Sequence, residues 1–236
     1  ILSGELVQNG DFEEIGSELV TNGNFDTDSY WSKGDGWSIS GGKANAATAF
    51  TNLGRTGFSF VTNKIYKVTY EVENYVSGKV RFQLTGGATL NGIDRTSNGV
   101  YTEYVKAIAN HTNFRFKATN SFTGSIDNVS VKEVGQNWTF GTGWSMGDGV
   151  AKHTQSDGAG RLYQSYTNFV IGKIYKLTAK IDTTGDLTLS NTALTFRNSA
   201  NTADLAVLSS GNGDILPNQI NNVELVGEYK SQRGST

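Results

Sequence analysis

The chain has 236 residues, of which 36% are hydrophobic and 11% aromatic, and 20 Lys and Arg against 22 Asp and Glu give a formal net charge of −2. This composition can supply a packed core, and it lacks the basic excess that is typical of nucleic-acid-binding proteins. A chain without Cys has no disulfides and no Cys-ligated zinc, and no run approaches the roughly 18 apolar residues of a membrane-spanning helix. We therefore expect no nucleic-acid partner and no membrane span.

The sequence offers few groups for catalysis. Only His111 and His153 could act as histidine bases, and neither belongs to a recognisable motif. The patterns of a nucleophile elbow, a phosphate-binding loop and a zinc protease are also missing. We expect that the protein is not an enzyme and that both histidines lie on its surface.

A short repeat opens the chain. Residues 5–12 read ELVQNGDF and residues 18–25 read ELVTNGNF, so the second copy follows closely after the first. A copy this short cannot form a domain by itself. Two interpretations of the first copy remain open: it is a flexible duplicated leader, or it is a strand that docks elsewhere.

The middle of the chain alternates apolar and polar residues with the period of half-buried β-strands. This pattern holds for residues 64–72, 79–84, 101–107 and 114–118. Clusters of Gly, Asn and Ser predict turns at residues 77–78, 86–87, 91–92 and 97–99. Because no window shows a helical period, the sequence predicts an all-β fold of the sandwich or jelly-roll type.

A second, larger repeat organises the whole chain. Trp31 and Trp37 return as Trp138 and Trp144, and FVTNKIYK at residues 60–67 returns as FVIGKIYK at residues 169–176. The offset of the second match exceeds that of the first by two, which fits one loop insertion, and the repeat has the length of one sandwich domain. We predict two tandem antiparallel β-sandwich (jelly-roll) domains. The predicted boundaries are a leader at residues 1–17, a first module at 18–134 and a second at 135–236.

The start of the second module differs from that of the first. It opens at Gln136 without an LVxNGxF segment of its own. One hypothesis is therefore that residues 5–12 pair with the second module or with a neighbouring chain. At the other end, residues 222–229 resemble the strand at residues 100–106, and no closing strand follows Tyr229. We expect the natural chain to continue past residue 236, and its start at Ile1 fits a fragment or a processed chain.

Several motifs in one order resemble a known family: ELVTNGNF at residues 18–25, the pair Trp31 and Trp37, KIYKV at 64–68 and SIDNVSV at 125–131. They are similar to jelly-roll carbohydrate-binding modules of the family 4 and 9 type, within the galactose-binding-like fold. Such modules also occur in structural proteins of tailed phages. The resemblance covers residues 18–133 well and 136–236 partly. It implies a ligand-binding or adhesive β-sandwich on a virion surface or in an extracellular setting.

Outward-facing residues of the predicted strands form the candidate ligand site, because planar amide and guanidinium groups can bind sugar hydroxyls. Tyr101 and Tyr104 could add stacking. The alternative is an ordinary solvated sheet face. For the Trp pairs we favour core packing over a sugar platform. The candidates on the strands are Glu71, Arg81, Gln83, Arg115 and Lys117.

The resemblance also implies a structural Ca²⁺ between the first strand and the closing strand. Asp26 and Asp127 occupy the matching positions, after NGNF and within IDNV. Their carboxylate oxygens are suitable calcium ligands. The alternative for Asp26 is that it caps a turn.

Three functions remain open. The first is a surface-exposed virion structural or adhesive protein: a tail fibre, receptor-binding or capsid decoration component with glycan-binding folds. The second is a binding module of a secreted polysaccharide-degrading enzyme. The third is a purely architectural filament or decoration subunit. The expected partners are a host-surface or environmental glycan and copies of the chain itself or other virion proteins.

Overall fold

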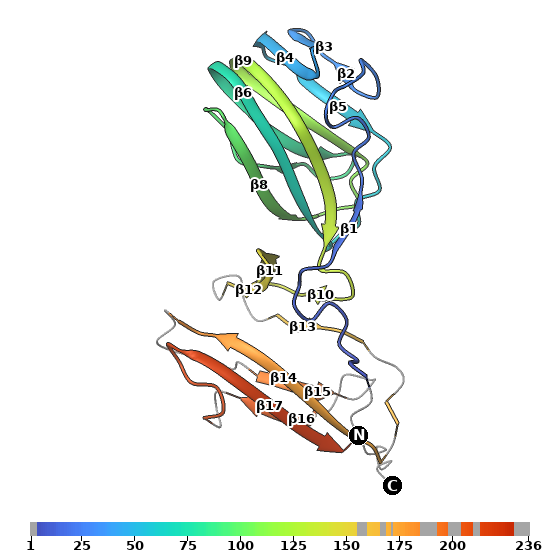
Figure 1. The fold of residues 1–236 in the computed structure, drawn as a ribbon, viewed down its shortest axis with the longest axis vertical. Helices are drawn as coiled ribbons and strands as arrows, with labels where there is room; N and C mark the ends of the chain where they lie inside the picture. Colours follow the sequence, from blue (N-terminus) through green and yellow to red (C-terminus); the bar gives the residue numbers. More distant parts are fainter. Residues whose placement is uncertain are drawn as a thin grey trace. The chain divides into compact units, whose positions relative to one another are not determined.

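The computed structural model describes residues 4–154, 160–165, 169–170, 172–184, 193–197, 204–209 and 213–228. Within these residues every regular element is a β-strand, so the predicted all-β class is confirmed (Figure 1). This part of the chain also holds no helix that could cross a membrane. The chain divides into two compact units, Ile1–Gln164 and Ser165–Thr236, which are described separately. The predicted module boundary at residues 134 and 135 stays a prediction.

Nine strands form one hydrogen-bonded sheet in the first unit. They are β1 (Ile15–Glu18), β2 (Ser32–Lys33), β3 (Trp37–Ser40), β4 (Lys43–Ala49), β5 (Asn52–Thr56), β6 (Ile65–Thr85), β7 (Leu90–Asn91), β8 (Gly99–Lys106) and β9 (Asn113–Val134). The long strands β6 and β9 pair along their lengths. Their first and last pairs are Ile65 with Val134 and Thr85 with Asn113.

Both long strands bend near their middle (Figure 1). The register of β6 against β9 shifts between Glu73 and Lys79, and positive φ angles occur at Asn74 and Gly78 in β6 and at Asn120 in β9. Such bulges increase local twist and turn a strand. The predicted turn at residues 77–78 is therefore wrong as a chain reversal: the strand continues through it with a bend.

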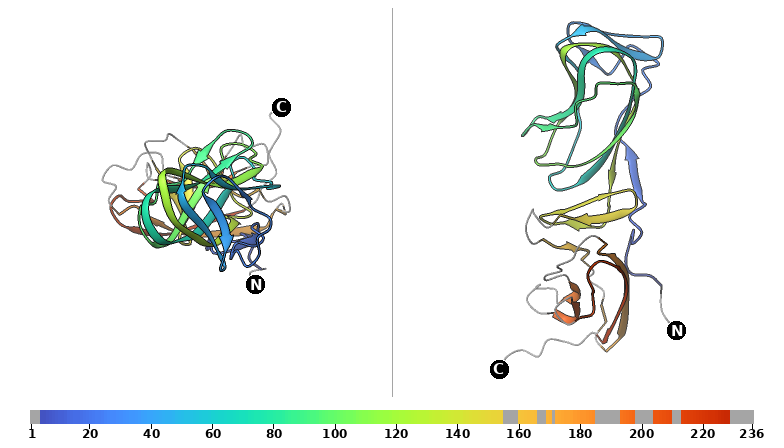
Figure 2. Two further views of the ribbon diagram at one scale, coloured as in Figure 1. Left: turned by 90° about the horizontal axis from the view of Figure 1, so that it is seen from above. Right: turned by 90° about the vertical axis from the view of Figure 1, so that its left-hand side faces the viewer.

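The bend folds the sheet over a core. The ring centroid of Tyr70, in the first half of β6, lies 6.4 Å from that of Phe82 in the second half and 5.1 Å from that of Phe116 in β9. Since Tyr70 pairs with neither residue in the sheet, these contacts cross the interior. The sheet is thus a two-layered sandwich, as in Figure 2. One layer holds β1, β8 and the 65–73 end of β6; the other holds β2, β5, β7 and the 77–85 end.

Aromatic and β-branched residues fill this core. In β6 the apolar residues of the predicted alternation, every second one from Tyr66 to Val72 and from Val80 to Leu84, are at most 1% exposed. Trp31 and Trp37 are only 5% and 7% exposed, which confirms core packing for this Trp pair. The core side chains include Phe25, Leu53, Phe60, Tyr66, Val68, Tyr70, Val72, Val80, Phe82, Leu84, Phe114, Phe116, Phe122, Ile126 and Val131. Burial of so many large side chains is the main stabilising contribution to this sandwich.

The first half of the second repeat lies in the same unit. Its strands are β10 (Thr139–Phe140), β11 (Trp144–Gly147), β12 (Val150–His153) and β13 (Leu162–Tyr163). They pair β10 with β13 and β11 with β12, as β2 pairs with β5 and β3 with β4. The register is the same in both copies: Thr139 opposes Tyr163 as Ser32 opposes Gly54. The sequence repeat is therefore a structural repeat.

Backbone hydrogen bonds locate the insertion between the copies. Thr154 N donates to Gly143 O at 2.9 Å, which matches the bond from Ala47 N to Gly36 O at 2.8 Å. The indole Nε1 of Trp144 donates to Gly160 O at 3.1 Å, as that of Trp37 donates to Thr51 O at 3.4 Å. Gly143 and Thr154 follow Gly36 and Ala47 by the offset of the Trp pairs, which is the shorter one. Gly160 follows Thr51 by the offset of the segments FVTNKIYK and FVIGKIYK, which is longer by two residues. The two extra residues thus fall between Thr154 and Gly160. The predicted loop there, residues 155–159, lies outside the described residues.

The second unit contains β14 (Ile174–Asp182), β15 (Ala193–Arg197), β16 (Asp204–Ser209) and β17 (Ile220–Glu228). Strand β14 pairs with β17 in the manner of β6 and β8: Ile174 opposes Glu228 as Ile65 opposes Lys106. The predicted likeness of residues 222–229 to the strand at 100–106 is therefore confirmed up to Glu228. Tyr229 and the expected continuation of the chain lie outside the described residues.

His111 corrects one prediction. Its side chain is fully buried rather than exposed, with its ring centroid 6.5 Å from that of Phe60. Burial lowers the pKa of His111 below its ordinary value of 6.5, because an imidazolium loses its hydration in the interior. His153 is exposed, as expected.

This burial predicts a pH-dependent stability. The unfolded chain takes up a proton on His111 near pH 6.5 and the folded chain at lower pH, so stability should fall as pH drops below 6.5. Melting temperatures at about pH 7.5 and pH 5.5 measure the fall. His111→Leu should reduce it, whereas His153→Leu should leave it unchanged. An equal fall in wild type and His111→Leu would contradict the assignment.

Candidate functional site

A row of planar polar side chains crosses the outer face of the second layer. We call Asn91, Gln83 and Arg115 the polar row. Gln83 of β6 opposes Asn91 of β7 on one side and Arg115 of β9 on the other. Because Phe82, Leu84 and the neighbours of Arg115 point into the core, Gln83 and Arg115 point outward, as the alternation predicted. Asn91, predicted only as a turn residue, lies on the same face beside Gln83.

Hydrogen bonds fix the orientation of the polar row. Gln83 Nε2 donates to Asn91 Oδ1 at 2.5 Å, and Arg115 Nε donates to Gln83 Oε1 at 2.9 Å. Gln83 is thereby held at 6% exposure, although it faces outward. In the described part of the chain, the terminal nitrogens of Arg115 and Nδ2 of Asn91 make no hydrogen bond. The row thus presents spare donors, and a ligand would have to supply acceptor oxygens.

A glycine leaves the end of the row open. Gly54 of β5 opposes Arg115 on the next strand, and a Cβ built at Gly54 would lie 3.3 Å from Arg115 Cβ. Any longer side chain at position 54 would stand beside the guanidinium. Nothing in the sequence indicates this role, because Gly54 looks like one of many turn glycines.

A second row of residues lies beside the polar row. Arg81 opposes Lys117, and Lys117 opposes Asn52. Arg81 and Lys79 share the carboxylate of Asp94, at 3.2 and 3.5 Å. Among the described residues, Lys117 and Arg115 have no acidic partner. This part of the sheet therefore carries a local positive charge.

Two buried atoms of this second row lack partners. Arg81 Nε and Asn52 Oδ1 make no hydrogen bond to any described residue. A buried polar atom without a partner costs about 1–3 kcal/mol. Both atoms would therefore gain from a bound water or ligand.

Glu71 lies apart from the polar row. It belongs to the first half of β6, where it opposes Asp127 of β9, and its Oε2 accepts a hydrogen bond from Asn128 Nδ2 at 3.0 Å. Since the two halves of β6 face each other across the core, their outward residues lie on opposite surfaces of the sandwich. Glu71 thus does not join Arg81, Gln83 and Arg115 in one site.

The two candidate tyrosines are also separated. Tyr101 packs on the core, with its ring centroid 5.7 Å from that of Tyr70, and its hydroxyl bonds Ser97 at 2.8 and 2.9 Å. Tyr104 opposes Lys67 on the outer face of the first layer. Neither ring lies beside the polar row, and their predicted stacking role stays a prediction.

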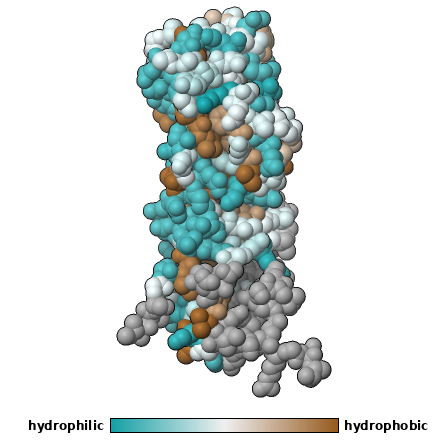
Figure 3. Space-filling model, turned by 90° about the vertical axis from the view of Figure 1, so that its right-hand side faces the viewer, coloured by the Kyte–Doolittle hydropathy of each residue, from teal (hydrophilic) through white to brown (hydrophobic). Residues whose placement is uncertain are grey.

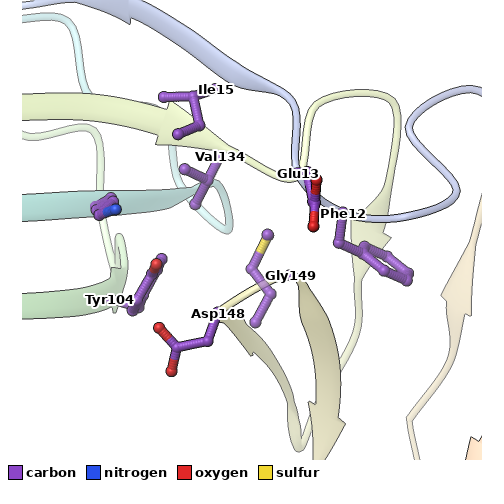
Figure 4. Close-up of a pocket in the computed structure, with 9 residues that line it drawn as sticks. Phe12, Glu13, Ile15, Tyr104, Val134, Asp148 and Gly149 are labelled. Carbon is purple, nitrogen blue, oxygen red and sulfur yellow. The ribbon is translucent and has the colours of Figure 1, made fainter.

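Tyr104 lines a cavity of about 340 Å³ near β11 and β12. Figure 4 shows Tyr104 and Phe12 at its opposite ends, with the carboxylates of Glu13 and Asp148 between them. Lys67 also lines it, and its Nζ lies 5.8 Å from the centroid of the Tyr104 ring. The cavity thus combines one cation with two carboxylates, and it is chemically less uniform than the polar row.

The predicted calcium ligands already have partners. Asp26 Oδ2 accepts a hydrogen bond from Asn24 Nδ2 at 2.5 Å, and Asp127 Oδ1 accepts one from Asn128 N at 2.7 Å. No three Asp, Glu or His side chains gather into a possible metal site within the described ranges. Because Ca²⁺ takes six to eight oxygens, these carboxylates alone fit it poorly, and most ligands would have to be carbonyls or water. The Ca²⁺ at Asp26 and Asp127 stays a prediction.

A buried polar cluster formed by Arg95, Glu103 and Tyr70 was not predicted from the sequence. Arg95 Nη2 lies 2.7 Å from Glu103 Oε1, Arg95 Nε donates to Tyr70 Oη at 3.3 Å, and Glu103 Oε2 accepts from Ile93 N at 3.0 Å. The guanidinium also lies 4.3 Å from the centroid of the Tyr101 ring. Burial raises the pKa of the Tyr70 hydroxyl. This cluster anchors the loop between β7 and β8, next to the Asn91 end of the polar row.

Apolar surface offers a weaker candidate. On the face shown in Figure 3, apolar residues of the described part form small groups among polar ones. Groups of this size are ordinary on soluble proteins. The polar row is therefore the better-supported candidate site.

Comparisons with known proteins do not identify a family for this chain. No family model and no curated protein matches the sequence. A solved structure described as "BiXyn10A CBM1 APO" is 14% identical, with a TM-score of 0.37 over 52% of this chain and 98% of its own. Another, described as "CBM4 structure and function", is 12% identical, with a TM-score of 0.33 over 53% and 98%. Similarity at this level carries no argument about ligand or activity.

The buried cluster makes a stability prediction. Arg95→Leu leaves Glu103, only 8% exposed, without its cation, and should lower the free energy of unfolding by about 3 kcal/mol. Lys33→Leu is the control, because it breaks the more exposed ion pair with Asp28 and should change stability by less than about 1 kcal/mol. Urea unfolding measures both variants. Equal effects would mean that the cluster does not stabilise the loop.

Proposed function

We propose that the protein is a non-catalytic, glycan-binding adhesive protein whose binding site is the polar row. The observation that carries the proposal is the fixed array of Asn91, Gln83 and Arg115 across three adjacent strands. Side chains that already hold one another need little ordering when a ligand arrives, which lowers the entropic cost of binding. Their spare donors suit the hydroxyl and ring oxygens of a sugar.

Charge favours an acidic glycan among the possible ligands. Arg115 and Lys117 have no acidic partner among the described residues and lie in adjacent rows on β9. A guanidinium binds a carboxylate or sulfate through parallel hydrogen bonds. A polysaccharide that carries such groups would neutralise both cations, whereas a neutral one would use only the hydrogen bonds.

The setting of this activity is part of the proposal. The tandem repeat, and the resemblance of the sequence motifs to modules in structural proteins of tailed phages, support a virion-surface protein. Such a protein could be a tail fibre, receptor-binding or capsid decoration component. Its partners would be a host-surface glycan and neighbouring virion proteins. A virion protein attaches more strongly when many copies bind at once, so weak binding by each site would suffice.

The proposal predicts a site-specific loss of binding. A glycan array of acidic and neutral polysaccharides, followed by calorimetry, identifies a ligand for the full chain. Arg115→Ala should then weaken binding about 10- to 100-fold, since a hydrogen bond to a charged group contributes about 1.5–3 kcal/mol.

Lys132→Ala is the matched control. Lys132 lies on the other half of β9, opposite Lys67, so its loss removes an equal charge from the opposite layer. It should leave affinity unchanged. Equal effects of the two substitutions would contradict the polar row as the site. Binding to no glycan, together with assembly of copies, would favour the purely architectural function.

A further inference from the structure

A Trp and a tight turn form a small clasp in the first module. The turn at residues 22–25 places Phe25 N 3.3 Å from Asn22 O, with both residues at positive φ. The indole Nε1 of Trp31 donates to Asn22 O at 3.0 Å, and the rings of Phe25 and Trp31 pack with centroids 5.1 Å apart. The NGNF motif is thereby joined to the strand that follows it.

The leader makes the same clasp with the second repeat. Phe12 N lies 3.2 Å from Asn9 O, again with both residues at positive φ. The indole Nε1 of Trp138 donates to Asn9 O at 2.8 Å, and the rings of Phe12 and Trp138 lie 5.0 Å apart. Trp138 is the repeat equivalent of Trp31, although Asn9 precedes it by 129 residues.

The two segments also share their internal hydrogen bonds. Asn9 Oδ1 accepts from Glu14 N at 3.0 Å, and Asn22 Oδ1 accepts from Thr27 N at 3.2 Å, in each case from five residues ahead. At the head of each segment, a Glu carboxylate accepts from the amide two residues later at 2.9 Å. The first segment thus repeats the turn and these internal hydrogen bonds of the second.

A third contact repeats across the chain. In the first module Arg55 Nη1 donates to Thr21 O at 2.8 Å. At the equivalent positions Gln164 Nε2 donates to Gln8 O, and Gln8 N donates to Gln164 Oε1 at 3.1 Å. Gln164 comes directly after β13, and its repeat equivalent Arg55 lies in β5, the equivalent of β13. The leader is thus bound by both Trp138 and Gln164, as residues 18–25 are bound by Trp31 and Arg55.

We infer that residues 5–12 are the first segment of the second repeat, and that described residues around Gln136, Trp138 and Gln164 form a binding site for an ELVxNGxF peptide segment. The first module is then an insertion between this segment and the rest of its repeat. The site recognises a turn whose Asn9 carbonyl accepts the Trp138 indole hydrogen bond in addition to that of Phe12 N, and whose Phe ring packs on the indole. This inference does not depend on glycan binding.

The leader is held less deeply than its counterpart. Phe25 and Trp31 are 1% and 5% exposed, whereas Phe12 and Trp138 are only partly buried. Less buried apolar area means a weaker contact. The segment should therefore leave and re-enter its site more readily than residues 18–25 do, and a peptide should be able to replace it.

The test removes the segment and returns it as a peptide. In a variant of the chain that lacks residues 1–13, amides 136–154 and 160–164 should lose hydrogen-exchange protection while residues 18–134 keep theirs. A synthetic peptide of residues 4–14 should restore protection at one peptide per chain. The same peptide with Phe12→Ala should bind at least tenfold more weakly.

Substitutions in the full chain provide the second arm, in case the truncated variant does not fold. Phe12→Ala should deprotect residues 136–154 and 160–164, and Phe25→Ala should instead deprotect the first module. Unchanged protection of residues 136–154 and 160–164 after deletion or Phe12→Ala would overturn the inference. Lost protection that saturating peptide does not restore would overturn the peptide-binding site.

Discussion

The shared bend of β6 and β9 is the constraint on which the rest of the first unit depends. Without the bulges between Glu73 and Lys79, the two strands would form one long, flat ribbon with both faces in water. The bend brings Tyr70 onto Phe82 and Phe116 and so closes the core. It also sends Gln83 and Arg115 to the surface of one layer, and Glu71 to the surface of the other. The polar row exists because the same fold that buries the aromatics aligns the outward residues of neighbouring strands.

A local motif recurs along the chain. It consists of two short strand pairs, two Trp residues and a turn that accepts an indole hydrogen bond. In the first module the turn directly precedes the Trp residues and the strand pairs, whereas in the second repeat the whole first module lies between them in the sequence. The geometry is nevertheless the same, because each indole needs an acceptor when it is buried and the Asn carbonyl of the NGxF turn accepts its hydrogen bond. The same contacts can therefore form whether the turn and the Trp are close in the sequence or far apart.

Much of this architecture could be predicted from the sequence, because alternation and repeats are local signals. The inward set from Tyr66 to Val72 and the repeat of the Trp pairs are examples. The sequence also places Tyr101 and Tyr104 on opposite faces of the sheet, because they lie an odd number of residues apart in one strand. What the sequence did not reveal depends on distant partners. His111 is buried by the Phe60 segment, and Arg95 meets Glu103 only because the loop after β7 returns over the sandwich. Gly54 has a role only beside Arg115.

We propose that the polar row, and not the opposite layer, binds the glycan. The most direct test is an NMR titration of the full chain with the best oligosaccharide from the array, observing side-chain amide and guanidinium signals. We expect the signals of Asn91, Gln83 and Arg115 to shift together and to saturate with one affinity, while those of Asn128 beside Glu71 stay unchanged. Shifts confined to Asn128 and the surroundings of Tyr104, with the polar row unmoved at saturation, would contradict this proposal.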